Sequence, residues 1–264
     1  MTVKVKRRTT QPPRRPPMIL WQRIIDVLAI ALWSILLLKY WLTGNINVLL
    51  HPDYHWLAHT ACIFLAVLAG FKSRQLWMVL RSRRPLPRLP HTTLFPPGVS
   101  SAILLGIAVL GLTITPRPFA SDLAVQRGVA DTLVMTRSQP QAFRASTQPQ
   151  DRSVIDWIRT LNVYPEPDAY TGQPVDVEGF VIHSTELPDD YLTIARFVIT
   201  CCAADVYPVG LPVKLPSNRT EYSEDQWFRV NGTMMTETLN GQRQLVIEAT
   251  QLTEIPEPDN PYDY

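Results

Sequence analysis

Several kinds of sequence are scarce or absent in this 264-residue chain. It has no nucleophile elbow, no glycine-rich phosphate loop and no HExxH motif, so nothing in it predicts an enzyme. Its three cysteines are too few for a disulfide framework. Acidic residues are nearly missing from the first 120 positions, which hold two of them against 15 Lys and Arg.

The charge of the second half is opposite. Residues 1–120 have a balance of +13, whereas residues 121–264 carry 10 basic and 21 acidic residues, a balance of −11. A basic, apolar half followed by an acidic, mixed half predicts a membrane anchor with an aqueous domain. The negative charge of that domain argues against binding nucleic acid.

The first half predicts three membrane spans. A disordered basic arm, 1–18, precedes a transmembrane region, 19–118, whose apolar segments lie near 19–42, 56–71 and 99–115. The second segment either stops at Phe71 or continues past Lys72. Positive residues gather in the arm and again after the second segment, which indicates a cytoplasmic N-terminus. Three crossings of a bacterial inner membrane then place the C-terminal domain outside the cytoplasm.

Four polar residues near the second segment allow two interpretations. His51, Asp53, His55 and His59 include donors of the kind that bind zinc, and His55 and His59 would share one helix face. Histidines at a membrane boundary are also common as interfacial polar residues. The sequence leaves both interpretations open.

The second half predicts a linker followed by one β domain. Residues 119–150 lack hydrophobic periodicity and predict a linker, and an amphipathic helix near 154–161 opens the domain 151–255. An acidic, proline-rich tail, 256–264, ends the chain.

The strand pattern of this domain favours a small closed barrel. Alternating apolar residues surround Gly179 and Gly232, and a glycine within a strand marks the sharp bend that such barrels need. The further segments 191–201, 206–215 and 244–255 bring the count to five strands. This number predicts an all-β, OB-like Greek-key barrel. A β-sandwich fragment is the competing fold.

One motif carries the candidate chemistry. Alternation along 196–202 directs Cys201 into the core and leaves Cys202 exposed. Adjacent cysteines form a disulfide only with strained geometry. Several roles are therefore open for the pair. It is part of the structural packing, a point of covalent attachment, a redox-reactive pair, or a zinc or copper site completed by Asp205 or His183.

The same residues carry a resemblance. The segment 170–181 and the run 196–205, which contains Thr-Cys-Cys-Ala-Ala-Asp, resemble a bacterial family of membrane proteins described as permease-associated or permease-regulator proteins. The resemblance implies a multi-span membrane permease as partner and supplies no catalytic residue.

Two functions are compatible with these features. The first is an accessory or regulatory subunit of a permease, whose external domain gates the transporter or handles its solute, with a metal ion as one such solute. The second is an independent membrane-anchored protein that binds metal or performs thiol redox chemistry.

Overall fold

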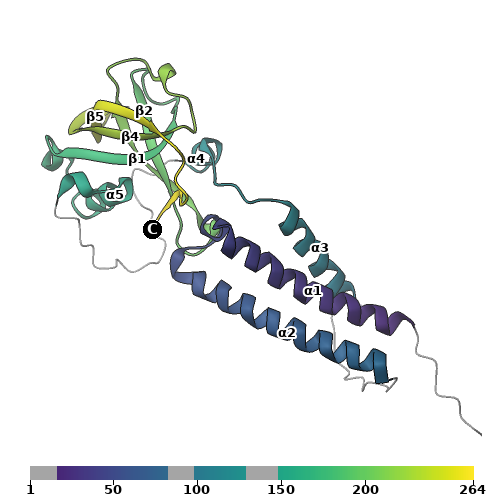
Figure 1. Cartoon of the computed structure of the whole chain (residues 1–264). Helices are drawn as coiled ribbons and strands as arrows, with labels where there is room; N and C mark the ends of the chain where they lie inside the picture. The colour runs from purple at the N-terminus through teal and green to yellow at the C-terminus, as the bar shows by residue number, and fades with distance from the viewer. Residues whose placement is uncertain (1–16, 83–97, 129–147) are drawn as a thin grey trace, which may run out of the picture. The chain divides into compact units, whose positions relative to one another are not determined.

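The computed structural model describes residues 17–82, 98–128 and 148–264, which fall into two compact units. Among the described residues, 17–43, 56–82 and 98–115 form one unit, and 44–55, 116–128 and 148–264 form the other. The first contains long helices and the second a β-sheet domain, which confirms the predicted two-part organisation (Figure 1). Nearly all of the predicted basic arm lies outside the described residues.

The N-terminal unit consists of the helices α1 (Pro17–Leu42), α2 (His55–Ser82) and α3 (Val99–Thr113). Two segments, Leu20–Leu42 and Pro52–Arg81, are long and apolar enough to cross a membrane, whereas Val99–Thr113 is shorter. The second helix does not stop at Phe71 but runs unbroken through Lys72. Its central apolar part and its basic end thus belong to one continuous helix.

Helices α1 and α3 are joined by side chains that bind main-chain carbonyls. Lys39 Nζ donates to Leu112 O over 2.8 Å and Tyr40 OH donates to Gly111 O over 2.9 Å, so both side chains satisfy carbonyls of the last turn of α3. A Cβ on Gly111 would lie 2.8 Å from Leu36 Cδ2. Glycine at position 111 therefore allows α3 to pack closely against α1.

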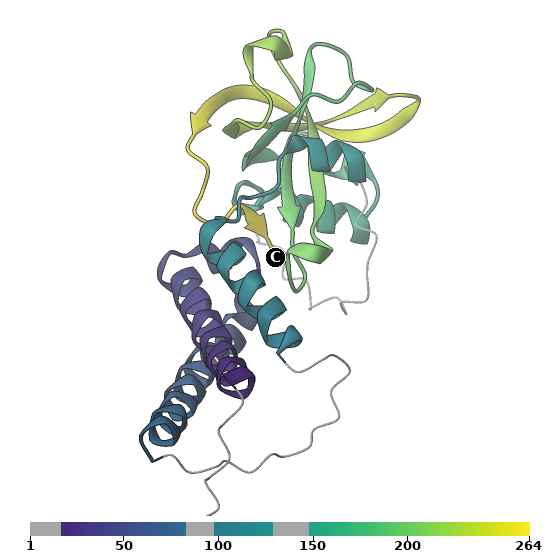
Figure 2. The ribbon, with the colours of Figure 1, turned by 90° about the vertical axis from the view of Figure 1, so that its right-hand side faces the viewer.

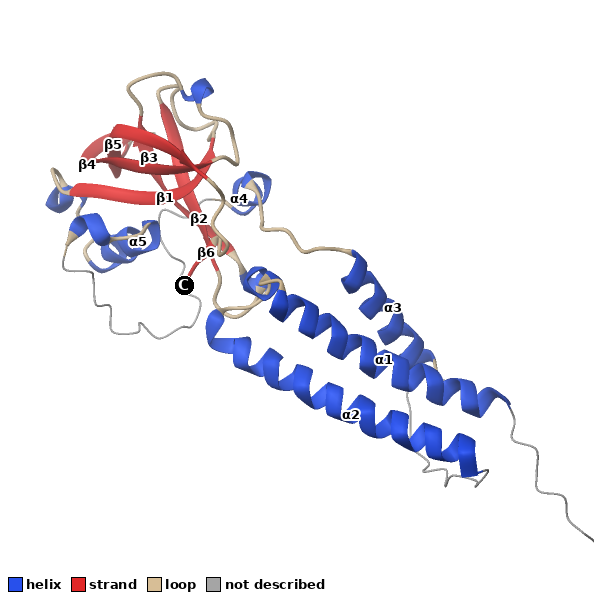
Figure 3. Ribbon diagram, viewed as in Figure 1, coloured by secondary structure: helices blue, strands red, loops and turns tan. Residues whose placement is uncertain are grey.

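The C-terminal unit contains one six-stranded sheet (Figure 3). Its strands are β1 (Pro174–Ile182), β2 (Tyr191–Val198), β3 (Tyr207–Lys214), β4 (Trp227–Leu239), β5 (Gln242–Ile255) and β6 (Tyr262–Asp263). Their order is β1-β4-β5-β3-β2-β6, and β1 also pairs with β2. Strands β1 to β5 therefore form a closed ring of pairings, because β1 pairs with both β4 and β2. The pairs β3–β5 and β2–β6 are parallel, and the others are antiparallel.

Glycines allow the strands to approach one another closely. A Cβ on Gly179 would lie 2.5 Å from Ala195 O on β2, and one on Gly232 would overlap Glu248 O on β5. The β4–β5 ladder also shifts register between Asn231 and Gly232. Glycine at both positions is thus needed by the backbone, and the predicted irregularity is confirmed at Gly232.

The longest hairpin depends on its turn. Asn240 and Gly241 connect β4 to β5 with φ values of 51° and 78°. Positive φ at both central residues is the geometry of a tight turn that matches strand twist, and Asn-Gly is its preferred sequence. The two long strands can therefore pair directly, as Figure 2 shows.

The predicted amphipathic helix is α5 (Val154–Val163). Ser153 caps its N-terminus, where Asp156 N donates to Ser153 Oγ over 3.3 Å and the Asp156 carboxylate accepts from Ser153 N. The buried face of the helix joins the core formed by the strands. Trp157 is fully buried and meets the Tyr170 ring edge to face, so it anchors the helix in the core.

Two predicted boundaries of this unit differ from the structure. Of the predicted linker, 119–150, residues 129–147 lie outside the described residues, but α4 (Ser121–Arg127) comes before that gap and buries Ala124 in a second apolar cluster of the unit, which also contains Phe197 and Tyr262. Residues 256–264 were expected to be a tail, but β6 pairs there with β2. Tyr262 supplies the driving force because its ring is 1% exposed. Sparse apolar residues among prolines and acids concealed this packing.

Candidate metal site

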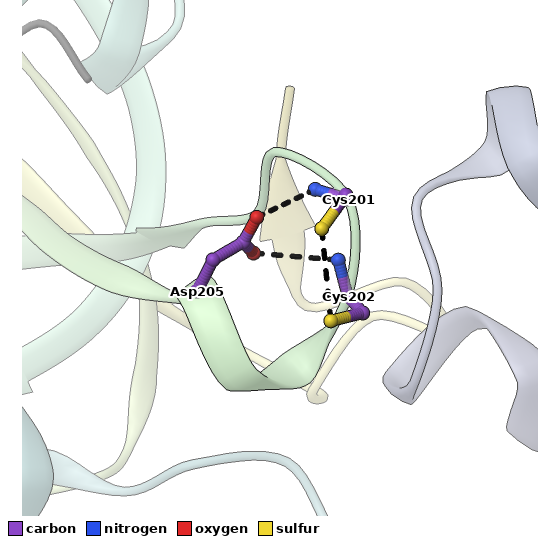
Figure 4. Close-up of side chains that lie close together, drawn as sticks. All are labelled: Cys201, Cys202 and Asp205. Atoms are coloured by element: carbon purple, nitrogen blue, oxygen red, sulfur yellow. Dashed lines mark hydrogen bonds between the residues drawn. The ribbon is translucent and has the colours of Figure 1, made fainter. Parts of the chain in front are cut away.

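The candidate site is a loop between β2 and β3. Strand β2 ends at Val198, and after the buried Ile199 the chain turns through the two cysteines into a single 3₁₀ turn, η5 (Ala203–Asp205). The Asp205 carboxylate organises the turn because it faces back toward the preceding backbone (Figure 4). Hereafter residues 200–205 are called the cysteine loop.

Three backbone N–H groups donate to Asp205. Cys201 N donates to Oδ2 over 2.8 Å, while Thr200 N and Cys202 N both donate to Oδ1 over 3.3 Å. Each carboxylate oxygen has two lone pairs. These three bonds use both lone pairs of Oδ1 and one of Oδ2, and the Cys201 thiol is a fourth donor to the carboxylate. Asp205 can thus hold the loop through the three backbone groups, and loss of the thiol proton would free one of its lone pairs for a cation.

The two thiols lie side by side. Their sulfurs are 3.7 Å apart, and the ligand atoms of Cys201, Cys202 and Asp205 all lie within 4.8 Å of one another. Zinc–sulfur bonds of about 2.3 Å at a tetrahedral angle place two sulfurs about 3.8 Å apart. Cys201 is exposed and Cys202 and Asp205 are half-buried. The donors are therefore spaced for a metal ion and open to solvent.

The electrostatics of the loop keep the thiol protonated and the acid ionised. The hydrogen bond to the Asp205 carboxylate, followed by that to Cys202, raises the pKa of the Cys201 thiol to about 12. For Asp205, burial raises the pKa, but hydrogen bonds from the Cys201 side chain and the three backbone groups lower it to a net value below the usual range. The negative charge of Asp205 favours the protonated form of the neighbouring Cys201 thiol. The same negative charge would attract a metal cation.

The predicted orientation of the cysteines is wrong. Strand alternation was expected to bury Cys201 and expose Cys202, whereas Cys201 is the more exposed of the two. The alternation stops because β2 ends at Val198, three residues before Cys201. The last core-directed residue is instead Ile199, which is 1% exposed.

His183 does not join the cluster. Its Nε2 lies 2.8 Å from Tyr222 O, in a loop contact next to the end of β1. Among the residues that the structure describes, the group of potential metal ligands comprises Cys201, Cys202 and Asp205. Of the four predicted ligands, three are brought together and His183 is not.

The four polar residues near the second helix likewise form no common donor set within the described chain. His51 Nδ1 accepts from Asp53 N over 3.1 Å, and His55 Nε2 lies 3.0 Å from Leu50 O. His59 stacks on the Trp41 ring with centroids 4.0 Å apart. These contacts favour the interpretation of ordinary polar residues over that of a zinc site.

One neighbour of the cysteine loop was not predicted from the sequence. The segment Gly44–His55, which connects α1 to α2 and is called the connection below, belongs to the β-sheet unit. Its Leu50 forms an antiparallel bridge with Cys202. The signal available in the sequence was the concentration of apolar residues in Ile46–Leu50, where four of five positions are Ile, Val or Leu, which is unusual for a solvent-exposed turn between two spans.

Comparison with known proteins places the β-sheet unit in context. Residues 138–264 match the family model described as the DUF1980 C-terminal domain. The UPF0703 protein YcgQ of Bacillus subtilis (strain 168) is a relative, 27% identical over 133 residues that cover 48% of this chain and 46% of that protein. The similarity thus spans about half of the curated relative and about half of this chain.

Proposed function

We propose that the protein is a membrane-anchored accessory subunit of a multi-span permease and that its β domain binds a thiophilic metal ion through Cys201, Cys202 and Asp205. The observation that carries the proposal is the cluster itself, two thiols 3.7 Å apart beside a carboxylate, with all three ligand atoms within 4.8 Å of one another. Thiolates select zinc and copper(I) over magnesium or calcium. An exposed set with three donors leaves a position at which the ion can be exchanged.

Metal binding is favoured over redox chemistry at this site. The nucleophile in thiol exchange is the thiolate. The neighbouring carboxylate and thiol raise the pKa of Cys201 to about 12, which leaves little thiolate at neutral pH. A metal ion displaces the thiol protons and is attracted by the carboxylate that disfavours thiolate formation.

The strand pairings support an OB-like Greek-key barrel as the fold of the β domain. Five strands pair in a ring, β1-β2-β3-β5-β4 and back to β1. Glycine occurs where β1 meets β2 and where β4 meets β5, as expected where strands bend sharply. In this fold the cysteine loop connects the second and third strands of the barrel.

The connection supports three membrane crossings and a common location for both soluble parts. Because Leu50 pairs with Cys202, the connection and the β domain lie on the same side of the membrane. If α1 and α2 both cross, α3 must cross as well. Its 15 residues span about 22 Å, which local thinning of a bilayer core of about 30 Å can accommodate. Basic residues in the arm and after α2 assign the cytoplasmic side to those segments and the outside to the β domain.

The permease partner is proposed from the resemblance and from the apolar helices. Large apolar side chains on all three helices are exposed within the described residues, among them Trp21, Phe64, Val67 and Leu110. Lipid or the helices of a larger membrane protein would cover them. Gentle purification from native membranes tests the proposal. Recovery with a multi-span permease supports it, whereas recovery of the chain alone with bound metal favours an independent metal-binding protein.

The metal site is tested on the full chain in detergent. The wild-type protein and the variant Cys201→Ser/Cys202→Ser are loaded with zinc or copper(I), desalted and analysed for metal content. Since serine keeps the size and loses the soft donor, we expect near-stoichiometric metal in the wild type and at least a tenfold loss in the variant. A Cys62→Ser variant is the matched control because Cys62 is buried in α2. Equal metal content in all three proteins would overturn the metal site.

A further inference from the structure

The connection between α1 and α2 holds the cysteine loop through its main chain. Leu50 and Cys202 face each other in an antiparallel bridge. His51 N donates to Cys201 O over 3.1 Å, and Ala203 N donates to Leu49 O over 2.9 Å. These two main-chain bonds, which join Leu49 and His51 to Ala203 and Cys201, are called the clamp below, and both cysteines lie within it. The pattern is that of a narrow, non-hydrogen-bonded pair, in which facing side chains are closest.

The connection is itself held in the core of the domain. Val48 is buried in a cluster that includes Ile199 and Val206, the residues on either side of the cysteine loop. Ala124 of α4 packs in the same cluster. The connection and both ends of the cysteine loop therefore share one set of apolar contacts, and a change in the position of the loop changes the packing of the connection.

We propose that the main-chain groups of Leu49, Leu50 and His51 position the metal site and that occupancy of the site is passed through this backbone to α1 and α2. The inference rests on the proposed function, because it concerns the metal site. The connection continues without a break into the C-terminus of α1 and the N-terminus of α2. A metal ion that fixes the cysteine loop thereby fixes the backbone between two membrane helices.

The coupling is reciprocal by thermodynamic necessity. If metal binding strengthens the clamp by some factor, the clamp strengthens metal binding by the same factor. Coupling free energies in proteins correspond to factors of about 5 to 150. Loss of one bond of the clamp should therefore lower zinc affinity about fivefold or more without removing a ligand.

Two pairs of variants break the clamp one bond at a time. Ala203→Pro removes the N–H that Leu49 accepts, and position 203 begins a 3₁₀ turn, where proline is tolerated. Cys202, at φ −156° and ψ 167°, already has the extended backbone required before proline. His51→Pro removes the other N–H at a residue whose φ is −60°. Ala203→Ser and His51→Ala keep the N–H and are the matched controls.

The experiment is hydrogen exchange of the full chain in nanodiscs, with and without zinc, together with a zinc titration. In the wild type and both controls we expect zinc to slow exchange in the cysteine loop and in residues 44–55. In the proline variants we expect zinc to bind at unchanged stoichiometry, about fivefold or more weakly, with protection confined to the cysteine loop.

Each possible result decides the inference. Zinc binding that leaves exchange in 44–55 unchanged in the wild type would overturn it, and so would proline variants that behave like their controls. In both cases the metal site would stand. Absence of zinc and copper(I) binding in the wild type would overturn the proposed function and this inference together. A proline variant that fails to fold is identified by thermal unfolding, and the other pair then decides.

Discussion

Two carboxylates near the end of β2 have opposite surroundings. Asp205 is half-buried, accepts three backbone N–H groups and has a pKa below the usual range. Asp263 on β6 is enclosed by protein, and burial raises its pKa although Arg196 lies 3.4 Å away. For Asp205, the hydrogen bonds lower the pKa by more than desolvation raises it. For Asp263, desolvation raises the pKa by more than the ion pair with Arg196 lowers it. One carboxylate organises a loop, and the other helps to attach a strand.

The Asp263 side of this comparison depends on Arg196. Its guanidinium pairs with Asp263, donates to Tyr262 O over 3.4 Å and lies over the Trp227 ring at 5.0 Å. Both charged side chains are less than a fifth exposed. The pair attaches β6 to β2, so the final residues of the chain belong to the core.

Arg196→Met should produce the largest effect. The substitution leaves the Asp263 carboxylate buried without its cation, and removal of one partner of a buried pair costs about 3 to 5 kcal/mol. Urea unfolding of the full chain in detergent, followed by tryptophan fluorescence, measures the loss. Arg229→Met is the control, because Arg229 is exposed and its pair with Asp176 contributes little. Equal losses in the two variants would contradict the assigned role of Asp263.

Asp205→Asn should have a smaller effect on stability. The amide keeps one oxygen acceptor but presents an N–H₂ group to one of the three backbone donors. Because Asp205 is partly solvated, we expect a loss of about 1 to 2 kcal/mol at neutral pH. The same urea titration measures it, and Asp122→Asn in α4 is a surface control. A variant as stable as the wild type would show that the three hydrogen bonds do not organise the loop.

The local part of the candidate site was predictable from the sequence. Cys201, Cys202 and Asp205 lie within five residues, so any tight turn brings their side chains together. The direction of Cys201 was not predictable, because it depends on the residue at which β2 ends. In the sequence, the alternation of apolar residues continues through Cys201. In the structure the strand has already ended, and Cys201 N donates to the Asp205 carboxylate instead of to a neighbouring strand.

The nonlocal parts of the fold were predictable only where a strong pattern marked them. The apolar spans and the glycine-containing strands gave such patterns. The pairing of Leu50 with Cys202 joins residues 152 positions apart, and β6 is two residues long. Neither the Leu50–Cys202 bridge nor β6 shows an alternation of apolar and polar residues in the sequence, because each forms by pairing with a partner strand rather than through local propensity. Such contacts require the tertiary structure.

The pH dependence of stability should separate the two carboxylates and is the smallest effect. Asp205 has a lowered pKa in the folded state, so its contribution is present above the ordinary carboxyl range and is lost as pH falls through the folded value. Asp263 has a raised pKa, so its charged form costs stability at neutral pH and that cost disappears as pH falls toward the ordinary range. The two contributions therefore change in opposite directions.

Unfolding measured from pH 7 to pH 3 tests this. The wild type should keep its advantage over Asp205→Asn from pH 7 down to about pH 4, where the carboxyl group of the unfolded chain begins to take up its proton. The advantage should then decline as the pH falls through the lower pKa that Asp205 has in the folded state. Its difference from Asp263→Asn should instead change above pH 4, where Asp263 takes up its proton in the folded state. If the difference in unfolding free energy from the wild type changed with pH in the same way for both variants, the pKa values of Asp205 and Asp263 would not be shifted in opposite directions. The contrast between the loop carboxylate and the strand carboxylate would then be wrong.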